Sequence, residues 1–273
     1  MTMGAQRFPT YFLPHGGGPC FFMDPPMGPP GTWDRMADFL RGIEADLGAR
    51  PRAILTVTGH WETPDLAVTS GAAPDLIYDY CGFPESTYSL RYPAPGDPAL
   101  AADVARLLEQ AGFPTIQDPA RGFDHGVFIP FLLAFPKAAI PVVELSVRQD
   151  LDPAAHLAMG RALAPLRDDR VAIVATGMSY HNLRGFFGSD PRGAAASEAF
   201  DAWLSEAVCN ETGETRSKRL IDWASAPSAR LCHPREEHLI PLMVAAGAAE
   251  DEPATHAYSD HVLGKAISGF RFG

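Results

Sequence analysis

Residues 53–58 form a run of apolar and β-branched residues, without the alternation of polar and apolar side chains seen in a half-exposed strand. Such a run is typical of a strand that is buried on both faces. Similar runs occur at residues 140–147 and 171–176, and shorter ones at 10–13 and 66–69. Strands buried on both faces need helices on each side, so the chain is expected to fold around a mainly parallel sheet.

Helical patterns lie between these runs and supply the covering layers. Apolar residues recur at mostly helical spacing in six segments, which are residues 33–47, 98–111, 127–135, 153–166, 197–210 and 238–246. Ser197 is expected to cap the start of the fifth helix. Alternating strands and helices predict an α/β fold, with a mainly parallel central sheet flanked by helices. A length of 273 residues allows two domains, but we expect one domain over residues 1–273.

The charge balance argues against two classes of partner. Lys and Arg total 22 and Asp and Glu total 33, which gives a formal net charge of −11. Nucleic acids and anionic membrane surfaces both require a basic face, so neither is expected as a partner. No apolar run approaches the ~18 residues of a membrane-spanning helix. The four cysteines are scattered and form no C-x-x-C pair, which is typical of reduced thiols in a cytoplasmic protein.

Histidines are the informative residues, and three of the nine follow predicted strands. His15 and His60 each stand in a glycine-containing turn directly after an apolar run, and His181 follows a third run by a few residues. Ligands of open parallel sheets bind at the carboxyl ends of the strands, so these imidazoles are expected to converge there. His125 lies in a turn bracketed by glycines. From spacing alone, the cluster is a candidate metal or acid/base site.

The other histidines carry weaker signals. His233 and His238 are five residues apart, which does not place two rings on one face of a helix, so this is not a helical zinc motif. We interpret His156, His256 and His261 as structural, because a lone histidine is more often a hydrogen-bonded surface or core residue than a ligand.

Six ordered segments carry a resemblance to a known family. They are residues 13–19 (LPHGGGP), 59–61 (GHW), 81–98 (beginning CGFP), 122–126 (GFDHG), 179–183 (SYHNL) and 237–242 (EHLIPL). Together they resemble class III extradiol ring-cleavage dioxygenases of the LigB superfamily, most closely the DOPA 4,5-dioxygenase-like branch. The likeness runs in register from about residue 9 to 245.

The resemblance implies roles for five histidines. His15, His60 and His238 would be metal ligands, His181 an acid/base beside the metal, and His125 a second catalytic histidine near the substrate. The wider superfamily uses two histidines and a carboxylate, so Glu237 is an alternative third ligand. The E-H-x-x-P pattern of the branch favours His238.

The resemblance also implies a reaction and a cofactor. A mononuclear non-haem Fe(II) site would insert both atoms of O₂ into a catechol substrate and yield a ring-opened semialdehyde acid. Zn(II) binds nitrogen ligands more tightly and can occupy the site in a purified sample. Two alternatives remain open, a zinc-dependent hydrolase on the same site and a non-enzymatic Memo-like binding protein. Retention of all five histidines favours the dioxygenase.

The sequence does not identify the substrate-binding residues. The aromatic and proline-rich segments at residues 21–31 and 78–98 are expected to line the pocket, since long ordered loops are usually functional. No basic cluster marks a site for a substrate carboxylate, and the candidates Arg91, Arg121, Arg184 and Arg235 are scattered. Which catechol is cleaved, and whether the chain forms a homo-oligomer, stay open.

Overall fold

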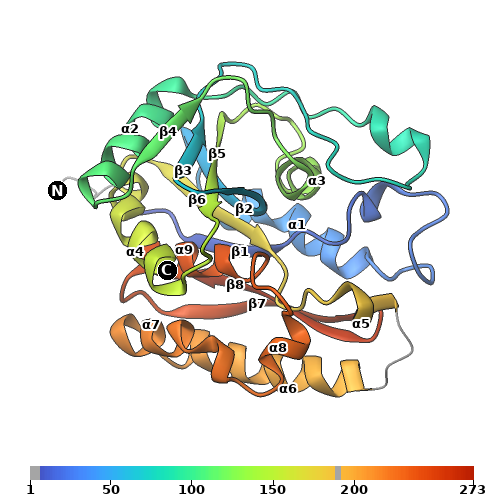
Figure 1. Cartoon of the computed structure of the whole chain (residues 1–273). Helices are drawn as coiled ribbons and strands as arrows, with labels where there is room; N and C mark the ends of the chain where they lie inside the picture. Colours follow the sequence, from blue (N-terminus) through green and yellow to red (C-terminus); the bar gives the residue numbers. More distant parts are fainter. Residues whose placement is uncertain (1–6, 188–191) are drawn as a thin grey trace.

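The computed structural model describes residues 7–187 and 192–273, and an eight-stranded sheet runs through them (Figure 1). The strand order is β4-β3-β5-β2-β6-β1-β8-β7. In chain order the strands are β1 (Thr10–Pro14), β2 (Ala53–Thr63), β3 (Leu66–Thr69), β4 (Thr115–Asp118), β5 (Val142–Arg148), β6 (Val171–Gly177), β7 (Ala254–Val262) and β8 (Lys265–Phe272).

The middle of the sheet is parallel, and antiparallel pairings lie outside it. Strands β5, β2, β6 and β1 pair in parallel, with Leu55 of β2 opposite Ile173 of β6 and Phe12 of β1 opposite Ala175 of β6. The β7–β8 hairpin extends the sheet beyond β1 in antiparallel sense, and β3 meets β5 in the same sense. The result is a single-domain α/β fold with a mainly parallel central sheet, as predicted.

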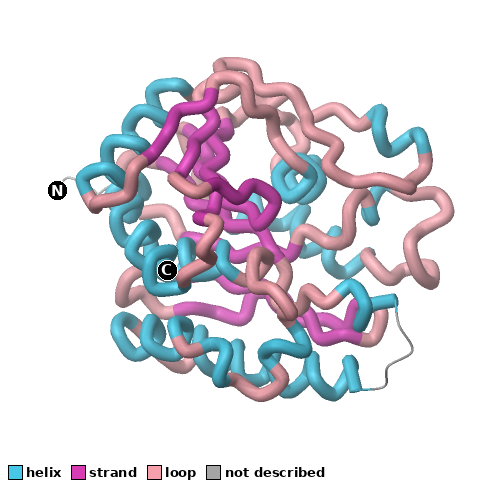
Figure 2. Tube along the Cα trace, viewed as in Figure 1, coloured by secondary structure: helices cyan, strands magenta, loops and turns pink. Residues whose placement is uncertain are grey.

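Helices cover the sheet on both sides (Figures 1 and 2). α1 and α3 pack together, and α3 contacts β2 and β6; α9 packs on β6 and β1 with α4 behind it, and α6 lies along the β7–β8 hairpin. The helices are α1 (Asp34–Asp46), α2 (Pro98–Gln110), α3 (His125–Ala134), α4 (Pro153–Leu163), α5 (Leu183–Phe187), α6 (Arg192–Cys209), α7 (Gly213–Ile221), α8 (Ala229–Cys232) and α9 (Ile240–Ala249). Among the described residues, no helix is long and apolar enough to span a membrane.

The five buried runs are confirmed as strands, but two local predictions were wrong. Strand β2 does not end at Gly59 and continues to Thr63, with an irregularity in its pairing to β5 between Val57 and Glu62. Ser197 does not cap a helix, because α6 already begins at Arg192. Its hydroxyl instead donates to the carbonyl of Ala194 and accepts from the amide of Ala266 in β8.

Candidate metal centre

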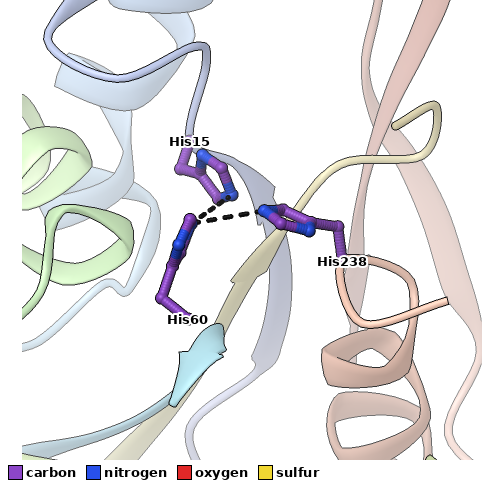
Figure 3. A group of neighbouring side chains, drawn as sticks. All are labelled: His15, His60 and His238. Atoms are coloured by element: carbon purple, nitrogen blue, oxygen red, sulfur yellow. Dashed lines mark hydrogen bonds between the residues drawn. The ribbon is translucent and has the colours of Figure 1, made fainter. Parts of the chain in front are cut away.

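Three imidazoles meet at the carboxyl-terminal end of the parallel strands (Figure 3). His15 directly follows β1, His60 lies in the irregular part of β2, and His238 stands two residues before α9. Nε2 of His60 is 3.4 Å from Nε2 of His15 and 3.3 Å from Nε2 of His238. The three side chains therefore present the same ring nitrogen to one point.

These separations fit a single metal ion. Two nitrogens bound tetrahedrally at about 2.1 Å from a metal lie about 3.4 Å apart. The candidate ligand atoms of His15, His60 and His238 all lie within 4.8 Å of one another. Imidazole nitrogens are common ligands of Zn and Fe, so the donor set suits either metal. The sequence thus brings together from three elements the residues that could hold one ion.

Two glycines allow His238 to reach this point. A Cβ on Gly59 would lie 2.5 Å from the carbonyl oxygen of Glu237, and a Cβ on Gly177 would lie 2.2 Å from that of His238. The amide of Met178 also donates to the carbonyl of His238, over 3.0 Å. Because neither glycine carries a side chain, the 237–238 backbone crosses directly over β2 and β6 and places His238 beside His60.

The carboxylate of Asp79 links His60 to a flanking histidine. Its Oδ1 lies 2.8 Å from Nδ1 of His125 and accepts from the His125 backbone amide at 2.9 Å. Its Oδ2 lies 3.2 Å from Nδ1 of His60. The two rings sit 4.0 Å apart at their centroids. One carboxylate therefore orients a residue of the trio and its neighbour together.

The carboxylate of Glu237 does the same on the opposite side. Its Oε1 lies 3.0 Å from Nδ1 of His238 and 3.2 Å from Nδ1 of His181. The rings of His181 and His238 stack, with centroids 3.4 Å apart and planes inclined by 18°. The carboxylate thus faces the Nδ1 edge of His238, whereas Nε2 of His238 faces His60.

This pattern assigns the ring protons of four histidines. A carboxylate accepts from Nδ1–H, which leaves the lone pair on Nε2. Nδ1 of His15, the remaining member of the trio, faces the carbonyl of Gly16 at 2.9 Å, with the same consequence. All five rings therefore have Nε2 available as a ligand or proton acceptor.

Burial and local charge set the protonation of these groups. Burial lowers the pKa of His15 and of His238 well below the ordinary value, and the neighbouring imidazoles lower it further. Burial also lowers the pKa of His125, although Asp79 opposes this. Burial opposes protonation of His60 as well, but the hydrogen bond to Asp79 and the charge of Asp124 leave its pKa raised. Neutral rings are the form that binds a metal.

Both carboxylates remain ionised. Burial acts to raise the pKa of Asp79, but hydrogen bonds with His125 and His60 outweigh it and hold that pKa well below its usual range. For Glu237 burial again acts upward, and the hydrogen bond with His181 leaves the pKa lowered. Each carboxylate is therefore charged at neutral pH and can stabilise a proton on its histidines.

A buried acidic pair lies behind the centre. The Asp124 side chain caps α3 by accepting from the Gly126 amide at 3.0 Å, and this fixes the start of the helix that carries His125. Glu144 of β5 is fully buried beside it. Burial, reinforced by the charge of Asp124, raises the pKa of Glu144 well above its ordinary value. The surroundings of Glu144 therefore favour its neutral form over a second buried charge.

The remaining four histidines lie outside the centre and make ordinary hydrogen bonds. The ring contacts are His156 to Asp152 and Arg148, His233 to the Ser179 carbonyl, His256 to Ser268, and His261 to Glu198.

Sequence reasoning missed Asp79, although it singled out the loop that carries this residue. The loop reaches the centre only near its start, where the ring of Tyr80 lies 5.6 Å from that of His125 in an edge-on contact. Phe83 packs on the turn after His15, since a Cβ on Gly18 would come within 2.9 Å of its ring. Residues 91–95 border a separate surface groove. The only signal for Asp79 was its position as an acidic residue between two tyrosines.

The fold and the site together define a class, an α/β protein with a histidine-rich candidate metal centre at the carboxyl ends of its parallel strands. The family described as "Catalytic LigB subunit of aromatic ring-opening dioxygenase" matches residues 9–271. The chain therefore belongs to the LigB family, as the sequence motifs indicated.

Individual relatives agree with this membership. The chain is 41% identical over 281 residues to "Dioxygenase tasH" of Hapsidospora irregularis, covering 97% of this chain and 85% of that protein. It is 34% identical over 258 residues to "4,5-DOPA dioxygenase extradiol" of Escherichia coli K12, covering 93% and 90%. A crystal structure of an uncharacterized protein of Escherichia coli K12 superimposes with a TM-score of 0.76 at 29% identity, covering 98% of this chain and 100% of the other. Family and relatives support a ring-cleaving dioxygenase.

Proposed function

We propose that this protein is an extradiol dioxygenase that inserts both atoms of O₂ into a catechol at one non-haem Fe(II), giving a ring-opened semialdehyde acid. His15, His60 and His238 would hold the metal. The observation that carries the proposal is the convergence of three Nε2 atoms, flanked by two more imidazoles whose Nδ1 atoms face carboxylates. Three ligands on one side of a metal leave open positions for two substrates.

Bound Fe(II) would supply a redox-active Lewis acid at which the catechol oxygens and O₂ are brought together. The three imidazoles that we propose as its ligands are neutral donors, so they leave the full positive charge of the metal to favour an ionised catechol. The protein's task is then to receive and return protons at fixed positions.

We assign the proton transfers to His181 and His125. With Nδ1 of His181 directed at Glu237, its Nε2 lies on the opposite edge of the ring and can accept a proton from a catechol hydroxyl. The Asp79 carboxylate orients His125 in the same way, so Nε2 of His125 can take up a proton from a substrate hydroxyl and return that proton as the ring opens. Each carboxylate would stabilise the imidazolium that forms.

The proposal is tested with metal-free protein reconstituted anaerobically with Fe(II) or with Zn(II). Fe(II) protein should consume one O₂ per catechol and form a yellow ring-opened product. Zn(II) protein should do neither, because Zn(II) has no redox chemistry. Absence of O₂ uptake with a panel of catechols would refute the proposal. Ester hydrolysis by the Zn(II) protein, without O₂ uptake by the Fe(II) protein, would favour the hydrolase alternative instead.

A further inference from the structure

An apolar hollow adjoins the histidine cluster on the side of His181. We call it the α5 pocket, because α5 supplies three of its side chains. Gly16 and Gly17, in the turn after His15, and His181 itself form the part nearest the cluster. The other large side chains that line it are Met27, Trp33, Met178, Leu183, Phe186, Phe187 and Leu263. His181 is thus the only titratable side chain among the described residues of the lining.

The wall of the α5 pocket is held in place from three directions. Nε1 of Trp33 donates to the carbonyl of Met27 at 2.7 Å, which ties the 21–31 segment to the start of α1. A Cβ on Gly17 would lie 2.8 Å from the terminal methyl of Met27, so that side chain rests on the turn beside His15. A Cβ on Gly28 would lie 2.7 Å from the side chain of Leu263, at the tip of the β7–β8 hairpin.

The mouth of the pocket is also apolar. Leu183 is 57% exposed and Phe187 is 67% exposed, both on α5 close to His181. Large apolar side chains left open to solvent beside a site commonly mark a ligand-binding surface. The side chain of His181 is 19% exposed, against 14% for His60, 9% for His125 and 7% for His238. A ligand that reaches the cluster by this side therefore passes an apolar rim.

None of the four arginines considered as partners of a substrate carboxylate lines the α5 pocket. Their positions in the structure are Arg91 on the Tyr78 hydroxyl, Arg121 on Asp124, Arg235 on Glu62, and Arg184 along a different hollow. An amino-acid side chain on the catechol ring would bring a carboxylate and an ammonium group into this pocket. Neither charge would find a partner of opposite sign among the described residues of the lining, and an unpaired charge there is unfavourable.

We propose that the α5 pocket binds the ring substituent of the catechol, and that this protein selects catechols with an alkyl or aryl substituent over those with a zwitterionic one. The inference rests on the proposed catechol-cleaving function. It separates this chain in specificity from the relatives named 4,5-DOPA dioxygenase. Those names describe the relatives, whereas the pocket lining belongs to this chain.

The test compares two ligands that share the same catechol head. Isothermal titration of the Zn(II)-loaded protein with 4-butylcatechol and with L-DOPA avoids turnover, and the ratio of the two Kd values isolates the substituent. We expect 4-butylcatechol to bind at least about tenfold more tightly, since a few buried methylenes are worth that much in an apolar pocket. Equal binding, or tighter binding of L-DOPA, would overturn the inference.

Two variants place the preference in the pocket. Leu183→Arg and Phe187→Arg put a cation at the rim, and both sites are exposed, so the fold should tolerate them. Each should reduce the Kd ratio several-fold by weakening 4-butylcatechol and strengthening L-DOPA. The matched control is Ile116→Arg, at a 60% exposed apolar site on β4 at the far edge of the sheet, which should leave the ratio unchanged. An unchanged ratio in both pocket variants would contradict the assignment.

The outcomes for substrate class and for reaction are separable. O₂ uptake by Fe(II) protein together with a preference for L-DOPA would refute the pocket inference alone. A preference for 4-butylcatechol without O₂ uptake from any catechol would refute the proposed reaction alone. Failure of both ligands to bind would refute the inference about the pocket as well as catechol recognition.

Discussion

The two sides of the histidine cluster use the same arrangement but build it differently. On one side Asp79 bridges His60 and His125, and on the other Glu237 bridges His238 and His181. In each pair one histidine belongs to the converging trio and the other flanks it. Glu237 is the chain neighbour of His238, whereas Asp79 arrives from a loop 46 residues away from His125. Similar geometry thus depends on local sequence in one half and on long-range packing in the other.

The ring arrangement also distinguishes the halves. His181 and His238 stack nearly face to face, with planes inclined by 18°, whereas His60 and His125 are tilted by 54°. The Asp79 side receives an additional hydrogen bond, from the backbone amide of His125. Asp79 therefore contacts two side chains and the backbone at the start of α3, while Glu237 contacts side chains alone. Loss of Asp79 should accordingly disturb its half more than loss of Glu237 disturbs the other.

The largest effect is expected from removing a member of the trio. His15→Ala, or His60→Ala from the Asp79 half, should abolish metal binding, because two imidazoles cannot replace the three converging nitrogens. Metal content per protein after dialysis, measured by mass spectrometry, checks this. His261→Ala is the control, since that side chain is 61% exposed and lies outside the centre. A metal-replete His15→Ala protein would rule out the proposed ligand set.

Removing a flanking histidine should separate turnover from metal binding. His181→Ala and His125→Ala each leave the trio intact, so metal content should stay near that of the wild type. Turnover should fall on the order of 10²–10⁴-fold, the usual contribution of a positioned acid/base. The measurement is catechol-dependent O₂ uptake at equal Fe(II) occupancy. If either variant loses its metal, that histidine is itself a ligand. The division of its half into one metal ligand and one flanking acid/base would then be wrong.

Neutralising the carboxylates tests the difference between the halves directly. Asp79→Asn and Glu237→Gln should each weaken metal affinity or turnover roughly 10–100-fold, as for other groups that orient metal ligands, with the larger loss for Asp79→Asn. A double-mutant cycle tests whether each carboxylate acts on turnover through the histidine of its own half. In a His125→Ala background, Asp79→Asn should cost less in turnover than in the wild type, and Glu237→Gln should cost the same. Equal coupling of His125 to both carboxylates would show that the halves are not independent.

The five histidines that the sequence singled out lie together in the structure, and several of them stand beside strong local signals. The runs before His15 and His181 are continuous apolar strands, and glycines mark the turns. Asp79 could not be predicted, because its role depends on where an irregular loop folds back. The Glu237 half depends on neighbours in the sequence and is therefore easier to predict than the Asp79 half, which depends on long-range packing.

The parts of the fold that the sequence missed have a related cause. Strand β7 is mostly polar and exposed, and β4 has only four residues, so neither shows the apolar run that identified the core strands. Strand β8, in contrast, is almost entirely buried, like the core strands that the apolar runs identified. Its antiparallel pairing with β1 brings chain ends together, which no local spacing reveals.

The last expected effect is on stability and not on turnover, and it concerns His233, a buried histidine outside both halves. Its ring donates to the Ser179 carbonyl, and burial lowers its pKa to about 4. At pH values between the ordinary pKa of 6.5 and the lowered pKa of about 4, this residue binds a proton in the unfolded chain but not in the folded chain. Stability should therefore fall as the pH is lowered through that window and change no further below it, by on the order of 3 kcal/mol for this residue.

His233→Gln isolates this contribution, because the glutamine amide can still donate to Ser179 and does not titrate. Urea unfolding of the metal-free protein from pH 7 to pH 4 should show a shallower loss of stability in the variant than in the wild type. The remaining slope then includes the other histidines whose pKa values are lowered by burial, which are His15, His125 and His238 of the centre and His156 outside it. Parallel curves for the two proteins would mean that His233 is solvated or protonated in the folded state. The acid sensitivity would then come from the histidine cluster and from His156.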